Sequence, residues 1–400
     1  MERRFDVIVI GSGPAGYKTA KLLLEKGKRV CLVERKAFGG LCLNAGCIPK
    51  DILYQTALSL LRVRELTGKR PDLSWKEAVA GAQEKVSRLR TLAEEHLRKL
   101  GLVLVRGEAE LVEEKVVRVG RERLIGDYIV LACGSRPAGQ GTSPEDLLTG
   151  RVTPAGRVLL RGEDASACEL AFILRIFGIE VAVEVKKELL SPYPQIPESF
   201  RAKLESSLEA LGVDISERGE GETIVESGNR IPDVCKQRFP FIRIRSDGFV
   251  DTDPFLETSV PGVYAVGDVV PPTGASFAYE KARVAVQNIL YGKSVRFEPS
   301  KVPFVITSAY EIGFVGDPEK AVRFEHRSLS LNPKNFVNHP AGILKVGYDE
   351  DGSAVFLTVI GHGVSEIVNA FSALTGGAFS HPSYAEILEE IVPPLGERVR

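Results

Sequence analysis

The sequence of 400 residues has little cysteine, no excess charge of either sign and no long hydrophobic run. Six cysteines are too few for a disulfide scaffold, so we expect any disulfide to be catalytic rather than structural. The net charge of −1 does not suggest a nucleic acid or an anionic membrane surface as a partner. Because there is no run of about 18 apolar residues and no secretory pattern, we expect no membrane span and a cytoplasmic location.

The first 34 residues have the pattern of a strand–helix–strand unit. The apolar run Phe5–Ile10 leads into a glycine turn and a helical pattern, and the next apolar run, Val30–Val33, is followed by Glu34. In such a unit the three glycines permit a tight turn, close approach to a pyrophosphate and close helix–strand packing, while the acid binds a ribose. The context therefore predicts a dinucleotide site formed by Gly11, Gly13, Pro14, Ala15, Gly16 and Glu34.

Further along the chain, the pattern indicates more than one α/β domain. Apolar residues at spacings of three and four predict a long amphipathic helix over 76–100, and short strands are expected at 102–105 and 128–131. The stretch 137–156 is rich in glycine and proline and is interpreted as a domain junction. A second strand–helix–strand pattern begins at Val158, and short strands with one or two helices follow from about residue 300.

The segment Gly39–Lys50 contains two cysteines, Cys42 and Cys47, five residues apart. On a regular helix they would face different directions, so pairing them requires an irregular turn with Cα atoms within about 7 Å. Asn44 and Gly46 supply that freedom. A metal site is not expected, because no second cysteine motif or histidine lies nearby. Two unrelated buried cysteines remain the alternative.

Gly39–Lys50 resembles the redox-active disulfide segment of the flavoprotein disulfide reductases. In that family a Gly-Gly-Thr-Cys-x-Asn-x-Gly-Cys-x-Pro motif follows an FAD-binding strand–helix–strand unit. Three further stretches are similar to family motifs in the same order: Ala132–Ser135, a strand end beside FAD; Thr258–Asp268, a second FAD fingerprint; and His381–Glu386, a C-terminal base dyad. The resemblance therefore covers nearly the whole chain.

The resemblance implies an α/β protein with two Rossmann-like domains of FAD and NAD type, the second reduced, and a C-terminal α+β dimerisation domain. The FAD domain would comprise 1–150 and 245–298, the reduced NAD-type segment 151–244, and the interface domain 299–400. FAD is the implied cofactor. Beyond the glycine turn, it would contact Gly40, Cys42, Gly134, Ser135, Gly267 and Asp268.

The resemblance also assigns the catalytic roles. Cys42 would be the interchange thiol that attacks or releases the substrate sulfur, and Cys47 would exchange electrons with the flavin as a thiolate. His381, oriented by Glu386, would be the base. In the family this histidine comes from the other subunit, so a homodimer is implied.

Glu169 matches a family glutamate that pairs with a lysine beside the flavin, and Lys50 is the candidate lysine. The alternatives are an ordinary helical glutamate and a register in which the family lysine aligns with Asp51.

The second nucleotide motif departs from the family pattern. In the register set by Glu169-Leu170-Ala171, the second glycine is replaced by Asp164 and the third by Ala167, and Glu163 adds a further negative charge. One carboxylate about 4 Å from a phosphate costs about 4 kcal/mol at an effective dielectric constant near 20, about a thousandfold in affinity. The acid expected after the next strand is also out of register, at Glu184. We therefore expect NAD(H) binding to be impaired or absent.

The sequence thus predicts an FAD-dependent dithiol/disulfide oxidoreductase most like dihydrolipoamide dehydrogenase. Its substrate would be a dithiol or disulfide, with a lipoyl-bearing protein as one candidate. Two alternatives stay open: a conventional NAD-linked dihydrolipoamide dehydrogenase, and an electron-relay flavoprotein subunit that exchanges electrons only with a partner protein.

Overall fold

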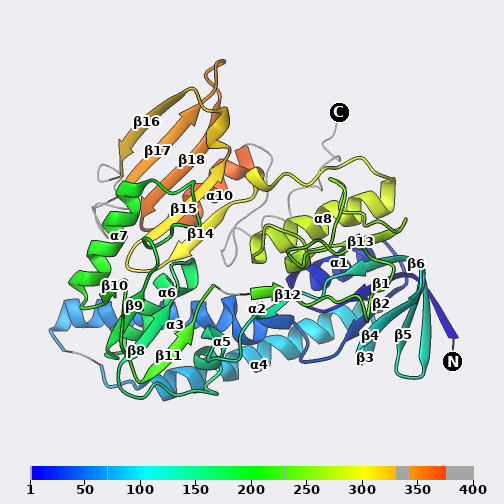
Figure 1. Ribbon diagram of the computed structural model, residues 1–400, viewed down its shortest axis with the longest axis horizontal. Helices are drawn as coiled ribbons and strands as arrows, with labels where there is room; N and C mark the ends of the chain where they lie inside the picture. Colours follow the sequence, from blue (N-terminus) through cyan, green and yellow to red (C-terminus); the bar gives the residue numbers. More distant parts are fainter. Residues whose placement is uncertain (1, 70, 229, 330–341, 375–400) are drawn as a thin grey trace. The chain divides into compact units, whose positions relative to one another are not determined.

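The computed structural model describes residues 2–69, 71–228, 230–329 and 342–374 (Figure 1). It divides into two compact units, each assembled from three stretches of chain. The first unit contains Met1–Ile48, Gln83–Ala138 and Arg230–Pro299, and the second contains Pro49–Ala82, Gly139–Asn229 and Ser300–Arg400. The predicted division into three domains stays a prediction. Among the described residues, no helix has the length and apolar character needed to cross a membrane.

The first unit is built on a seven-stranded sheet in which β3, β2, β1 and β6 are parallel neighbours, and β13 pairs with β6. These strands are β1 (Glu2–Ile10), β2 (Val30–Glu34), β3 (Val103–Arg106), β6 (Glu122–Leu131) and β13 (Val263–Ala265). β4 (Ala109–Glu113) and β5 (Val116–Val119) extend β6 as an antiparallel meander. Buried side chains of β1, β2 and β6 form the centre of this core.

Helices α1 (Pro14–Glu25) and α8 (Ala275–Tyr291) pack against each other in this unit. The short α2 (Gly40–Ala45) and the 3-10 turn η1 (Gly267–Val269) follow β2 and β13. A separate antiparallel pair joins β7 (Ser135–Pro137) to β12 (Arg230–Pro232). Two long helices, α3 (Cys47–Thr67) and α4 (Trp75–Lys99), have residues in both units.

The second unit contains a smaller parallel sheet in the order β10-β9-β8-β11. Its elements are α5 (Pro144–Leu148), β8 (Val158–Arg161), α6 (Ala165–Ile176), β9 (Val181–Glu184), α7 (Glu198–Ala210), β10 (Asp214–Ser216) and β11 (Thr223–Glu226). This strand order is that of half a Rossmann fold. The first three strands are added toward one edge of the sheet, and the fourth strand is placed on the other side of the first. The point where the order reverses lies between β8 and β11, where such folds bind ligands.

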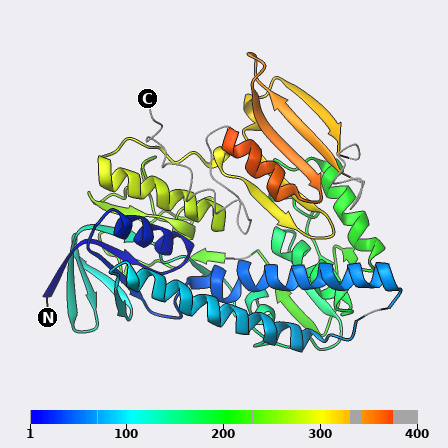
Figure 2. The same cartoon turned by 180° about the vertical axis from the view of Figure 1, so that it is seen from behind.

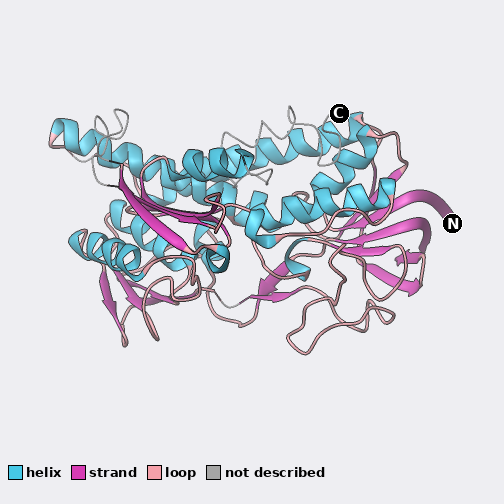
Figure 3. Cartoon of the chain, turned by 90° about the horizontal axis from the view of Figure 1, so that it is seen from above, coloured by secondary structure: helices cyan, strands magenta, loops and turns pink. Residues whose placement is uncertain are grey.

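The second unit also contains a five-stranded antiparallel sheet, in the order β14-β15-β18-β17-β16. The strands are β14 (Phe304–Thr307), β15 (Glu311–Gly316), β16 (Arg323–Ser328), β17 (Ile343–Tyr348) and β18 (Ala354–Gly361). α10 (Val364–Leu374) packs on β15 and β18 (Figure 2), while η2 (Pro299–Lys301) and η3 (Pro318–Lys320) lie in the connections. Both units contain helices and strands (Figure 3), and the predicted α/β class is confirmed.

Candidate functional site

The glycine turn after β1 forms the tight contacts that the sequence predicts. Gly11 has a φ of +104°, and a Cβ there would lie 2.3 Å from the Ala132 carbonyl oxygen. A Cβ on Gly16 would lie 1.9 Å from the Gly11 carbonyl oxygen. Only glycine permits this close approach of α1 to the strand.

A bare backbone surface lies at the start of α1. Gly13 is the N-cap of this helix, and no side chain caps its first turn. Gly40, with a φ of +61°, faces Gly13 so closely that a Cβ on Gly40 would lie 2.6 Å from the Gly13 Cα. A Cβ on Gly13 would meet no side chain within 4 Å, and a helix N-terminus of this kind, without a side-chain cap, fits the pyrophosphate of a dinucleotide.

Glu34 ends β2 beside this turn and is 8% exposed. Its Oε2 accepts hydrogen bonds from the Ser12 amide at 2.9 Å and the Ser12 hydroxyl at 2.6 Å, while Oε1 accepts from the Lys36 amide at 2.7 Å. A carboxylate has about four acceptor positions, so the Glu34 side chain keeps capacity for a ribose hydroxyl.

The second predicted cofactor segment lies in the same unit. Asp268 Oδ2 accepts a hydrogen bond from the Ser135 hydroxyl at 3.0 Å, and Oδ1 accepts from the Gly274 amide at 2.9 Å. Gly134 and Gly267 both have positive φ, of +75°. The structure thus joins the strand-end stretch Ala132–Ser135 to the second FAD fingerprint, Thr258–Asp268, through residues 133 positions apart in sequence.

These residues fit FAD. The uncapped start of α1, the close glycine contacts and the acid at the end of β2 supply the groups that a dinucleotide requires, and Asp268 supplies a second carboxylate in the same unit.

Cys42 and Cys47 flank the break between α2 and α3. Cys42 is buried at 8% exposure, and Cys47, partly exposed, is the first residue of α3. Gly46 separates the helices with φ −124° and ψ −116°, and a Cβ on it would lie 3.3 Å from the Cys42 Cα. The chain therefore folds back on Cys42 immediately before Cys47, as the predicted irregular turn requires. The disulfide itself stays a prediction.

Lys50 and Glu169 form an ion pair, with 2.5 Å between the lysine Nζ and Oε1. The same Oε1 accepts from the Thr307 amide at 3.1 Å and from the Thr307 hydroxyl at 3.2 Å. The glutamate is 4% exposed, so its charge is compensated by these donors inside the second unit. The predicted role of the pair beside a flavin is untested. His381 and Glu386 lie outside the described residues.

Both acids of the second glycine turn have partners within the protein. Glu163 Oε2 accepts from the Lys186 amide at 2.9 Å and Oε1 from the Ser191 hydroxyl at 3.0 Å. Asp164 caps α6 by accepting from the Ala167 amide at 3.3 Å, and it also accepts from the Ser227 hydroxyl at 2.5 Å. The sequence showed the two charges but not these partners.

One buried residue beside the cofactor segment was not foreseen. Lys281 of α8 is 0% exposed, and its Nζ donates to the carbonyl oxygens of Gly267 at 3.2 Å, Val270, and Pro272 at 2.6 Å. Burial lowers the pKa of Lys281 to about 7, opposed by the negative charge of Asp268. Its three hydrogen bonds fix the turn that carries Asp268. No motif in the sequence indicates this role.

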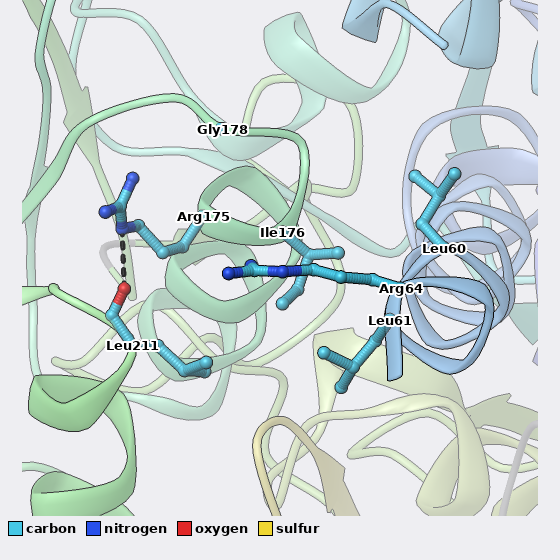
Figure 4. Close-up of a pocket in the computed structure, with 7 residues that line it drawn as sticks. All are labelled: Leu60, Leu61, Arg64, Arg175, Ile176, Gly178 and Leu211. Carbon is cyan, nitrogen blue, oxygen red and sulfur yellow. Dashed lines mark hydrogen bonds between the residues drawn. The ribbon is translucent and has the colours of Figure 1, made fainter. Parts of the chain in front are cut away.

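The second unit also contains a surface pocket of about 170 Å³ between α3 and the ends of α6 and α7 (Figure 4). Arg64 extends across it, and Arg175 donates from Nε to the Leu211 carbonyl oxygen at 2.7 Å. Of the predicted catalytic and cofactor-binding residues that the structure describes, none lines this pocket.

The fold and these residues define an oxidoreductase of the flavoprotein disulfide reductase class. The pyridine nucleotide-disulphide oxidoreductase family matches residues 5–238. The chain is 25% identical to dihydrolipoyl dehydrogenase of Bacillus subtilis, with 96% of each sequence covered. It is 24% identical to soluble pyridine nucleotide transhydrogenase of Mycobacterium tuberculosis, covering 100% of this chain and 98% of that protein.

Among solved structures, the chain is similar in fold to RclA, an HOCl-induced flavoprotein disulfide reductase from Escherichia coli. The TM-score is 0.78 at 20% identity, with 96% of this chain and 98% of that chain covered. The chain belongs to the pyridine nucleotide-disulphide oxidoreductase family, a family that uses FAD and NAD(P)H. The resemblance and the predicted enzyme class are confirmed.

Proposed function

We propose that the protein is an FAD-dependent dithiol/disulfide oxidoreductase of the dihydrolipoamide dehydrogenase type whose reaction with NAD(P)H is impaired or absent. The observation that carries the dithiol reaction is the fold-back at Gly46, which brings the chain against Cys42 directly before Cys47. When bound, FAD would supply the two-electron acceptor or donor for this cysteine pair.

In the proposed reaction, a substrate thiolate attacks the sulfur of Cys42 in a Cys42–Cys47 disulfide. The S–S bond breaks, Cys47 leaves as a thiolate, and a mixed disulfide forms between substrate and Cys42. The second substrate thiol then displaces Cys42, which closes the substrate disulfide. His381, oriented by Glu386, receives a proton from the substrate thiols. Two electrons pass from the substrate to the cysteine pair.

The impaired nicotinamide reaction is supported by the contacts of Glu163 and Asp164. Where a dinucleotide fold presents glycines to a pyrophosphate, this turn presents two carboxylates that accept hydrogen bonds from the protein itself. A cytoplasmic homodimer with a lipoyl-bearing or other redox protein as partner is part of the same proposal.

The proposal is tested by anaerobic titration of the holoprotein with dihydrolipoamide and, separately, with NADH, while the flavin spectrum is recorded. Dihydrolipoamide should reduce the protein quickly and NADH very slowly. Rapid reduction by micromolar NADH would return the protein to the conventional NAD-linked class.

Two substitutions separate the roles of the cysteines. Cys42→Ser should show a long-wavelength thiolate–flavin absorbance without reductant, and Cys47→Ser should lack it after reduction. The opposite pattern would overturn the assignment.

Subunit complementation tests the dimer and His381. Inactive His381→Gln and Cys42→Ser proteins, mixed and allowed to exchange subunits, should regain part of the dithiol activity. A fully active monomer in sedimentation would contradict the shared site.

A further inference from the structure

The two glycine turns of this chain can be aligned by their own hydrogen bonds. The Gly11 amide donates to the Val33 carbonyl oxygen at 2.8 Å, and the Gly162 amide donates to the Glu184 carbonyl oxygen at 3.1 Å. Each bond joins the first residue of a turn to the neighbouring parallel strand. The equivalent pairs are therefore Gly11 and Gly162, Ser12 and Glu163, Gly13 and Asp164, Pro14 and Ala165, and Glu34 and Val185.

This alignment shows that the acidic residue lies at the strand end in the first unit but in the glycine turn in the second unit. In the first unit the acid stands at the strand end, and Ser12 of the turn donates to it. In the second unit the strand-end position is Val185, which is 6% exposed, and the acid is Glu163 of the turn. Its carboxylate accepts from main-chain and side-chain donors just beyond Val185, at residues 186, 187 and 191.

The start of α6 also differs from the start of α1, because its main-chain amides are bonded to side chains. The first turn of α1 has no side-chain cap, whereas the Ala167 amide of α6 donates to Asp164. The Ala165 amide donates to the Tyr193 hydroxyl at 3.4 Å. Tyr193 is held in place by stacking on Phe304, with ring centroids 5.1 Å apart. Amides that a pyrophosphate would use are therefore bonded to side chains of this chain.

The crevice between β8 and β11 is bridged as well. The Ser227 hydroxyl, directly after β11, donates to Asp164 at 2.5 Å, and the Ser227 amide donates to the Arg161 carbonyl oxygen at 2.8 Å. Ligands of open parallel sheets bind where the strand order reverses, which is this place.

We infer that Glu163, Asp164 and Tyr193 are specificity-determining residues that exclude pyridine nucleotides by acting as built-in ligands of the nucleotide site. Glu163 fastens the segment 186–193 across the strand end, Tyr193 and Asp164 bind amides at the start of α6, and Asp164 also closes the crevice with Ser227. This inference rests on the proposed function and gives a cause for it other than charge repulsion.

Charge repulsion and internal hydrogen bonding predict different nucleotide binding when Glu163 and Asp164 are replaced by the amides glutamine and asparagine, which have the same shape but no charge. If repulsion excludes the nucleotide, removing both charges should restore binding. If internal hydrogen bonds exclude it, the asparagine side chain in place of Asp164 would still accept from the Ala167 amide and the Ser227 hydroxyl through its amide oxygen. The glutamine side chain in place of Glu163 would accept from the Lys186 amide through its oxygen and donate from its NH2 group to the Ser191 hydroxyl oxygen, so the site would stay closed. The informative protein is therefore the Glu163→Gln/Asp164→Asn holoprotein, with Glu188→Gln as a control that removes a charge from the same segment.

The experiment measures binding of NADH and of ADP by calorimetry, together with hydrogen exchange of peptides covering residues 185–193. The amide double variant should bind neither probe at millimolar concentration, like the wild type. A second variant, Glu163→Ala/Tyr193→Phe, removes two of the acceptors and should increase exchange in the segment by about tenfold or more.

Binding of NADH or ADP by the amide double variant would overturn the inference while leaving the proposed function intact. Unchanged exchange in Glu163→Ala/Tyr193→Phe would also overturn it, because the segment would then be held by other contacts. Tight NADH binding by the wild-type protein is the distinct result that defeats the proposed function itself.

Discussion

Replacing Lys50 by methionine tests how much the buried Lys50–Glu169 ion pair contributes to the stability of the second unit. The substitution removes the lysine from Glu169, which is 4% exposed, while the amide and hydroxyl of Thr307 still donate to its Oε1. Losing one partner of a buried pair costs about 3–5 kcal/mol when the remaining charge is uncompensated. Because Thr307 remains and the Lys50 side chain is 17% exposed, we expect a loss of about 2–3 kcal/mol in the free energy of unfolding.

A double-mutant cycle isolates the pair from other effects of the methionine. Lys50→Met/Glu169→Gln removes both charges, so it should be more stable than the sum of the single losses predicts, by about 2 kcal/mol. Trp75, the only tryptophan in the sequence, is buried in the second unit, and its fluorescence in urea reports unfolding there. Lys76→Met, at an exposed position, is the matched control. A coupling energy below about 0.5 kcal/mol would refute the reasoning.

Four further substitutions have defined outcomes. Gly40→Ala places a Cβ 2.6 Å from the Gly13 Cα, so FAD affinity measured by flavin fluorescence should fall by about tenfold or more. Gly81→Ala, where a Cβ meets nothing within 4 Å, should leave FAD affinity unchanged and stabilise α4 by up to about 1 kcal/mol. Lys281→Met leaves three carbonyl oxygens without their donor and should lower the free energy of unfolding by about 3 kcal/mol or more in urea, with loss of FAD. Partial burial raises the pKa of Glu163, but hydrogen bonds from Lys186, Ser191 and Lys187 hold it below its usual value. The ionised Glu163 carboxylate therefore contributes its full stabilisation above about pH 4.5, and this contribution is lost as the pH falls through the lower pKa of the folded state. In acid titrations, the difference in unfolding free energy between the wild type and Glu163→Gln should therefore narrow below about pH 4.5.

Local patterns in the sequence were sufficient for the first nucleotide unit. The predicted strands at 5–10 and 30–33 lie within β1 and β2, and the helix predicted over 76–100 is α4, Trp75–Lys99. Apolar periodicity and glycine turns act between neighbours in sequence, so they can be read without the fold. The glycine and proline residues of 137–156 predict only a junction, whereas the stretch contains α5, whose start is a capping box between Ser143 and Asp146.

Contacts between distant residues could not be predicted in the same way. The charges of Glu163 and Asp164 were evident, and the strand-end acid is out of register as expected, because the position equivalent to Glu34 is Val185. However, Glu163 meets donors 23 to 28 residues away, and Asp164 meets Ser227 63 residues away. Such partners depend on how β9 and β11 return to the turn, which no local pattern specifies. The sequence therefore indicated repulsion where the structure has hydrogen bonds.

Leu190 lies in the segment that Glu163 fastens, and its backbone has a φ of +62°, a conformation that costs a non-glycine residue about 1–2 kcal/mol. Its amide donates to the Glu163 carbonyl oxygen at 2.6 Å, and its side chain is completely buried in the core of the second unit. Burying a leucine contributes about 1.5–3 kcal/mol, which exceeds the backbone cost. Glycine would relax the turn but remove that burial. The apolar core beneath the segment thus adds to the hydrogen bonds of Glu163 and Tyr193 in holding it, so a cavity at Leu190 should loosen the segment even with those two residues intact.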